Sequence, residues 1–262
     1  MFEFINFSGE KIQTFLLVIF RASGMFAFAP IIGHRSIPKM LKIGLMILLS
    51  GMIASTFGEV TIAPFSSIWE LAGAALKEIL VGAIISLFFL LIFYAAQTAG
   101  AIIGYQVGLA LAAEFDPNAG DQVSVMGRFW FLMATLIFLS IDGHHMMISA
   151  FADSYLVIPA GSVEFDGTVG ELIIKYTTYV FILALKIAAP VLITLFLTDV
   201  ALGTIAKTMP TMNVFFVGFP VKIAMGLIVM AMSLPAFSYV LSKGISFLDG
   251  ELDQMFHLMG KA

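Results

Sequence analysis

Residues 71–112 read LAGAALKEILVGAIISLFFLLIFYAAQTAGAIIGYQVGLALA, an apolar stretch interrupted by charge only at Lys77 and Glu78. As a single helix rising about 1.5 Å per residue it would be roughly 60 Å long. That is about twice the hydrocarbon thickness of a bilayer, which is about 30 Å. We therefore expect this helix to bend, to break or to project beyond a membrane.

The rest of the chain has the same apolar character. Of its 262 residues 60% are hydrophobic and 11% are charged, against about 45–50% and about 25% in soluble domains. These values exclude an ordinary soluble enzyme. Six stretches approach the roughly 20 apolar residues of a membrane-spanning helix, and they predict an all-α, polytopic membrane protein built of helical hairpins. These stretches are 12–32, 40–57, 71–112, 125–152, 178–206 and 214–241.

The charge balance and the N-terminal sequence bear on two further features, nucleic-acid binding and a signal peptide. The chain has 13 Lys and Arg against 17 Asp and Glu, a formal net charge of −4, and no basic cluster, so we expect no nucleic-acid partner. Met1-Phe-Glu-Phe lacks the basic segment of a secretory signal peptide. We therefore expect the first apolar stretch to belong to the mature protein.

Several apolar stretches contain charged residues or proline. Examples are Lys77 with Glu78, Lys186 near Pro190, and Lys222. An isolated charge inside a bilayer costs a few kcal/mol, and a proline leaves a backbone group without its helical partner. Either these charges snorkel or pair, or many of these helices face protein rather than lipid, which is the interpretation we favour.

Small residues recur at every fourth position near the end of the 71–112 stretch. They form a ridge on one helix face that lets another helix approach closely, as small-xxx-small patterns do in membranes. The ridge packs either within the chain or, as we favour, against other subunits. Its members are Ala96, Gly100, Gly104, Gly108 and Ala112.

An acidic segment rich in turn residues follows this ridge. Asp116-Pro117 and the sequence Asn118-Ala119-Gly120 disfavour helix, so we expect the helix to end by Asp116. Irregular backbone at membrane depth must lie inside protein or a water-filled cavity. A solvated loop between two membrane spans is the alternative.

The group Asp142-Gly143-His144-His145 holds the most concentrated set of potential ligands or catalytic side chains. Adjacent histidines on a helix point about 100° apart, and HExxH spacing, nucleotide-binding loops and nucleophile motifs are absent. We therefore predict no enzymatic activity, no metal and no cofactor. We expect Asp142 and Gly143 to kink the fourth apolar stretch.

Asp199 supports a second hypothesis about function. A carboxylate inside a broken membrane helix can serve an ion-coupled transporter. The alternative role is structural, with Asp199 paired to Lys186 or Lys207.

Taken together, several motifs resemble the FliR family of flagellar biosynthetic proteins and the related T subunit of virulence type III secretion systems. The Pro210–Lys222 block, Pro-x-x-Asn-x-Phe-x-x-Gly-x-Pro-x-Lys, is the most specific of them. The others, in chain order, are Arg21 with Pro30, Gly33–Pro38, Gly100–Gly108, Asp116–Pro117 and Asp142–His145.

The resemblance implies an export gate for unfolded flagellar proteins, in the bacterial inner membrane at the flagellar basal body. It implies FliP-type and FliQ-type sister subunits, an FlhB-type switch protein and an FlhA-type ring as partners. In this family the subunits assemble into a tapering helical array. Residues 1–262 would form one FliR-type domain. Its residues of about 1–175 would resemble a FliP-type subunit (the P-like part), and its residues of about 176–262 would resemble the helical hairpin of a FliQ-type subunit (the Q-like hairpin).

The resemblance also assigns roles to individual residues. A loop over 109–122 would plug the closed pore, through Leu109, Leu111, Phe115, Asp116 and Pro117. The block of motif residues near the hairpin turn would contact other subunits, through Pro210, Asn213, Phe215, Gly218, Pro220 and Lys222.

Overall fold

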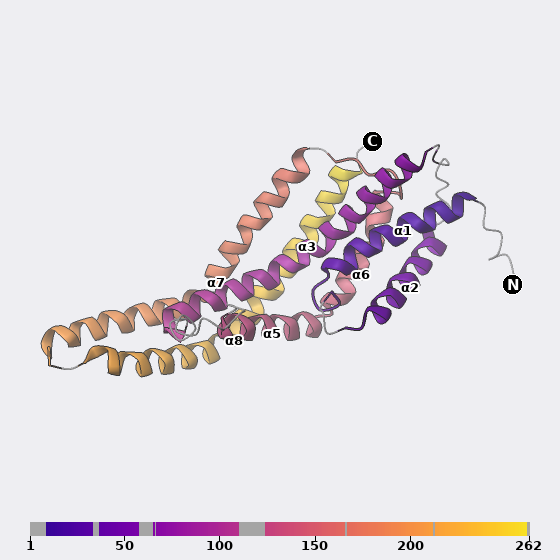
Figure 1. Ribbon diagram of the computed structural model, residues 1–262. Helices are drawn as coiled ribbons and strands as arrows, with labels where there is room; N and C mark the ends of the chain where they lie inside the picture. Colours follow the sequence, from indigo (N-terminus) through magenta and orange to yellow (C-terminus); the bar gives the residue numbers. More distant parts are fainter. Residues whose placement is uncertain are drawn as a thin grey trace. The chain divides into compact units, whose positions relative to one another are not determined.

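The structure, a computed structural model, describes residues 9–33, 37–57, 65, 67–109, 124–165, 167–211 and 213–260, and most of these residues lie in helices. Within these ranges there is no β-strand, which confirms the predicted all-α fold. The helices, labelled in Figure 1, are α1 (Gly9–Phe28), α2 (Lys39–Phe57), α3 (Ile68–Val107), α5 (Val125–Ser140), α6 (Gly143–Val157), α7 (Gly167–Thr208) and α8 (Val214–Met259).

Within the described residues, each predicted apolar stretch coincides for most of its length with one or two of these helices. Four helices, α2, α3, α7 and α8, are long and apolar enough to cross a bilayer. The pair α5 and α6 would add a fifth span, although the two helices are bent by 68° at the break between them. These findings confirm the polytopic membrane class. The helix α3 does not break within Ile68–Val107, a length of 40 residues.

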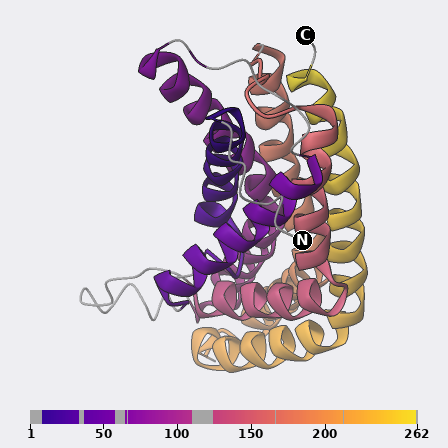
Figure 2. The ribbon, with the colours of Figure 1, turned by 90° about the vertical axis from the view of Figure 1, so that its right-hand side faces the viewer.

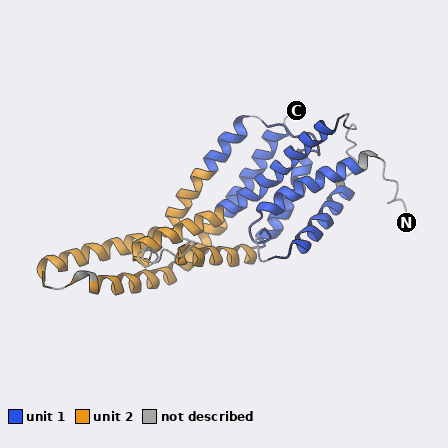
Figure 3. Cartoon of the chain, viewed as in Figure 1, with its two compact units in different colours: residues 1–91, 142–176, 245–262 blue, residues 92–141, 177–244 orange. Residues whose placement is uncertain are grey.

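The described helices group into two compact units, shown in Figure 3. Unit 1 comprises residues 1–91, 142–176 and 245–262, and unit 2 comprises residues 92–141 and 177–244. The helices α3, α7 and α8 contribute to both units. This grouping does not test the division into parts of about 1–175 and 176–262, which stays a prediction.

Unit 1 has its core between α1, α3 and α6. Leu17, Met25, Ile85 and Phe151 are completely buried there. The helix α2 packs on α1 (Figures 1 and 2) but buries only 11% of its apolar window inside the chain. The remaining apolar surface of α2 must therefore meet lipid or another protein.

Unit 2 is built around aromatic side chains. Trp130 of α5 is fully buried and meets Phe237 of α8 edge to face, with ring centroids 4.3 Å apart. Phe93 of α3 packs in the same way on Phe138 of α5, at 5.3 Å. The hairpin of α7 and α8 completes the unit, and both helices continue through internal prolines at Pro190, Pro220 and Pro235.

Candidate functional site

A buried ion pair lies in the core of unit 1. The Nε of Arg21 lies 2.5 Å from Oε2 of Glu78, and both side chains are 0% exposed. Nη1 of Arg21 donates to Oγ of Ser154 at 2.9 Å, and Nη2 donates to the carbonyl oxygen of Ile158 at 3.0 Å. The guanidinium thus ties α1 to α3, to α6 and to the residues that follow α6.

The carboxylate of Glu78 is satisfied on both oxygens. Its Oε1 accepts the backbone N–H of Gly161 at 2.8 Å, and the ring of Tyr155 lies 3.9 Å from the Arg21 guanidinium. Burying two charges is costly unless each has hydrogen-bond partners. The network supplies these partners. Glu78 is therefore a paired charge, which was one of the two explanations that the sequence allowed for charges in the apolar stretches.

Lys77, the neighbour of Glu78, also has a partner in the chain. Its Nζ donates to the carbonyl oxygen of Val163 at 3.0 Å. Both charges in the long apolar stretch are therefore held by protein groups.

Two glycines let α1 and α3 approach backbone to backbone. A Cβ at Gly82 would collide with the carbonyl oxygen of Arg21, and a Cβ at Gly24 would collide with that of Ile79. This close approach sets the Arg21 guanidinium beside Glu78. This crossing was not predicted from the sequence, although its signal was present there: Gly24 and Gly82 are small residues three and four positions from the charges of Arg21 and Glu78.

A second polar network joins three helices of unit 2. Asp199 of α7 pairs with Lys222 of α8, with Oδ1 and Nζ 2.9 Å apart. Nε2 of Gln106, on α3, donates to Oδ2 of Asp199 at 3.1 Å. The predicted partners of Asp199, Lys186 and Lys207, were wrong, because the antiparallel return of α8 brings Lys222 closer than helix spacing along α7 brings either of them.

The small-residue ridge faces α5 of the same chain. A Cβ at Gly100 would meet the carbonyl oxygen of Met126 and the indole of Trp130, and a Cβ at Gly104 would lie 2.6 Å from Oγ of Ser124. Ala96 is completely buried. The intrachain alternative thus accounts for these three positions.

The ridge is also shorter than expected. The helix α3 ends at Val107, and Gly108 has φ of 92°, a left-handed conformation that glycine adopts without strain. Gly108 lies against the ring of Phe219. Because Gly108 lies beyond the end of α3, it does not belong to the small-residue face of that helix.

Most of the predicted plug falls outside the part of the chain that the structure describes. Leu109 is described and is partly buried next to Gly108. The residues outside the described ranges are Leu111, Ala112, Phe115, Asp116 and Pro117.

The predicted subunit-contact block surrounds the turn between α7 and α8. Pro210 and Asn213 are exposed, and the carbonyl oxygen of Asn213 accepts the N–H of Phe216 at 3.1 Å. Phe215 lies in the first turn of α8. The other three members lie on α8: Gly218 is buried near Leu202, Pro220 is exposed, and Lys222 pairs with Asp199.

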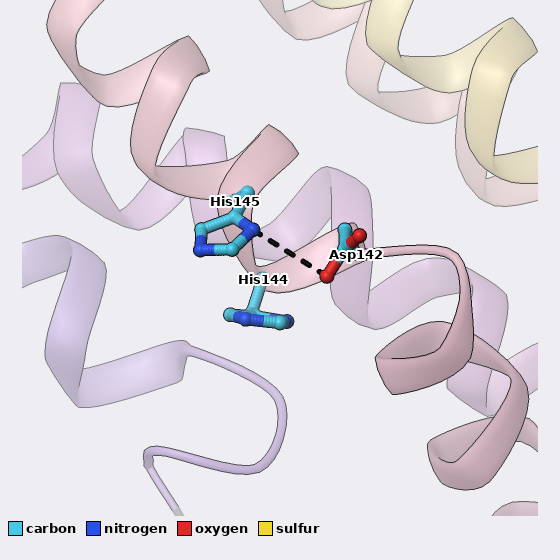
Figure 4. A group of neighbouring side chains, drawn as sticks. All are labelled: Asp142, His144 and His145. Atoms are coloured by element: carbon cyan, nitrogen blue, oxygen red, sulfur yellow. Dashed lines mark ion pairs between the residues drawn. The ribbon is translucent and has the colours of Figure 1, made fainter.

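Asp142, His144 and His145 cluster at the start of α6 (Figure 4). Asp142 has φ of 58°, and the chain bends by 68° between α5 and α6, which confirms the predicted kink. Nδ1 of His145 lies 3.5 Å from Oδ1 of Asp142, and both side chains are 71% exposed.

The same three side chains carry ligand atoms that a metal could bind. These atoms lie within 4.8 Å of one another, and the two imidazole centroids are 4.2 Å apart. Donors on a tetrahedral ion with bonds of about 2.1 Å are only about 3.4 Å apart. Exposed side chains would have to move closer to hold an ion, so the arrangement alone assigns no metal here.

Comparison with known proteins identifies the family. The family described as "Bacterial export proteins, family 1" matches residues 12–248. The flagellar biosynthetic protein FliR of Bacillus subtilis (strain 168) is 32% identical over 254 residues, which cover 96% of this chain and 97% of the relative.

Two further relatives carry the same name. FliR of Aquifex aeolicus (strain VF5) is 33% identical and covers 90% of this chain and 90% of its own length. FliR of Escherichia coli (strain K12) is 32% identical over 83% of this chain and 82% of its own length. With matches of this extent, the chain belongs to the FliR family of bacterial export proteins.

Proposed function

We propose that this protein is a structural, pore-forming and gating subunit of a flagellar type III secretion export gate in the bacterial inner membrane. The observation that carries the proposal is the match of nearly the whole chain to FliR proteins named for flagellar biosynthesis. In this role the chain passes unfolded flagellar proteins and catalyses no reaction.

The distribution of apolar surface supports an assembly of several subunits. The apolar windows of α2 and α8 bury only 11% and 22% of their residues inside the chain. Neighbouring helices of FliP-type and FliQ-type subunits would cover these faces, and an FlhB-type switch protein and an FlhA-type ring would be further partners. Residues of about 1–175 would act as the P-like part, and about 176–262 as the Q-like hairpin.

The gating part of the proposal concerns residues 109–122. The left-handed Gly108 ends α3 immediately before this segment. The segment contains Leu109, Leu111 and Phe115, and apolar side chains in a narrow pore block ions by dewetting as well as by bulk. We assign it to closure of the resting channel.

A deletion tests the plug directly. Removing residues 112–122 from the assembled gate should raise ion leakage through cells or proteoliposomes that hold the complex. The matched control replaces Asp121 by Asn in the same segment and should leave leakage at the wild-type level. Wild-type leakage from a correctly assembled deletion variant would reject the assignment.

An ion-coupled transporter that uses Asp199 is the alternative function. A transport carboxylate must be able to release its partner and take up an ion, whereas Asp199 is bound by both Lys222 and Gln106. Coupled uptake by the isolated chain in sealed vesicles, lost in Asp199→Asn, would favour this alternative.

A further inference from the structure

Lys186 is a charge on the apolar outer face of α7. It lies near the middle of this helix, Gly167–Thr208, and its side chain is exposed. The neighbouring side chains on the same face are also exposed and are apolar: Ile182 is 47%, Leu185 54% and Ile193 61% exposed.

The spacing of charges along α7 brings a charge into any membrane crossing. Around Lys186 the nearest charged residues of the helix are Lys175 and Asp199. The uncharged runs 176–185 and 187–198 are both shorter than the roughly 20 residues that span a hydrocarbon core. A crossing of about 20 residues that excludes both Lys175 and Asp199 therefore contains Lys186.

The two charges differ in how the chain satisfies them. Asp199 is neutralised by Lys222. Lys186 has no hydrogen-bond or ion-pair partner among residues 9–33, 37–57, 67–109, 124–165, 167–211 and 213–260. An unpaired cation at membrane depth is expensive and in most cases faces a partner group.

The backbone next to Lys186 is polar as well. Pro190 has no N–H to donate to the carbonyl oxygen of Lys186, four residues earlier. A cation and a carbonyl that lacks its usual helical donor thus occur at one point of an otherwise apolar face.

We propose that this face of α7 binds a helix of another membrane subunit, and that the helix presents an Asp or Glu carboxylate to Lys186. Apolar contacts with Ile182, Leu185 and Ile193 supply the surrounding interface, and the ion pair sets its register. The exposed apolar side chains on both sides of Lys186 favour a partner helix over a lipid headgroup, which would lie at a boundary between apolar and polar surface. This inference depends on the proposed function in one respect: both require that the chain assembles with other membrane subunits.

Crosslinking identifies the partner without removing Lys186. A photoreactive amino acid in place of Ile182, in cells that express the full set of export proteins, should give an adduct between this chain and another membrane subunit. Adducts with lipid alone, or only within this chain, would overturn the proposal.

Charge reversal then tests the ion pair in the same cells. Lys186→Glu should lower recovery of the complex at least about tenfold, because like charges in an interface repel strongly, while Lys186→Arg should assemble normally. Lys207→Glu, the same change in the exposed last turn of α7, is the matched control and should leave recovery unchanged. An acidic residue at the crosslinked position of the partner, changed to Lys, should restore assembly with Lys186→Glu.

The outcomes separate this proposal from the proposed function. A complex that assembles fully with Lys186→Glu contradicts the ion pair and leaves the export-gate function standing. Failure of the wild-type chain to join any complex contradicts the function itself.

Discussion

The guanidinium of Arg21 and the carboxylate of Glu78 meet at 2.5 Å although the residues are 57 positions apart, and neither side chain is exposed. Ser154, Ile158 and Gly161 complete their hydrogen bonding. The pair therefore joins the faces of α1 and α3 that meet in unit 1. Removing the ion pair tests whether the stability of the unit 1 core depends on these hydrogen bonds and charges.

Glu78→Gln should destabilise the protein by about 3–5 kcal/mol, because it leaves the buried Arg21 cation without its counter-charge. Thermal unfolding of the protein in mild detergent, followed by circular dichroism, measures the change. Replacing both residues, Arg21→Met with Glu78→Met, should cost less than Glu78→Gln alone, because no buried charge then lacks a partner. A single variant as stable as the wild type would show that the ion pair is not formed.

Gly82→Ala should destabilise unit 1 by about 1–3 kcal/mol, the usual cost of overpacking, because its Cβ meets the backbone of Arg21. Gly73 is the matched control on the same helix, since a Cβ there meets nothing within 4 Å. Gly73→Ala should stabilise the protein by about 0.4–1 kcal/mol. Equal effects of the two changes on the unfolding temperature would contradict the close crossing of α1 and α3.

Gly100→Leu should destabilise the chain before any partner binds, because Gly100 faces Met126 and Trp130 of α5. Gly203→Leu on α7, where a Cβ meets nothing within 4 Å, is the control for the size of the side chain. The measurement is the unfolding temperature of the purified chain. If Gly100→Leu blocks only assembly and leaves that temperature unchanged, the ridge packs against other subunits instead.

Asp199 and Lys222 should be coupled by about 0.5–1 kcal/mol in a double-mutant cycle, a small value because the pair is partly exposed. The variants are Asp199→Asn, Lys222→Met and their combination, compared by their stability in detergent. Purely additive effects would mean that the ion pair does not stabilise unit 2.

The helical class and the positions of the apolar helices were predictable because they depend on local sequence. Apolar runs of known length indicate membrane helices, and Asp142-Gly143 marks a backbone break that the left-handed Asp142 confirms. The family was predictable from motifs such as Pro210–Lys222 because their spacing is specific.

The contacts between distant segments were not predictable in the same way. A sequence without an alignment shows that Asp199 needs a partner but not that the return of α8 supplies Lys222. The ridge at Gly100 shows that something approaches closely, but small residues do not tell whether it is α5 or another subunit. The Arg21–Glu78 pair depends on which faces of α1 and α3 meet, which only tertiary packing decides.

The composition of the complex around this chain tests the central claim most directly. The chain, tagged and extracted from bacterial membranes in mild detergent, is analysed by native mass spectrometry. We predict an assembly that contains FliP-type and FliQ-type subunits together with this chain. A folded monomer, recovered alone from cells that express all of these proteins, would contradict its role as an export-gate subunit.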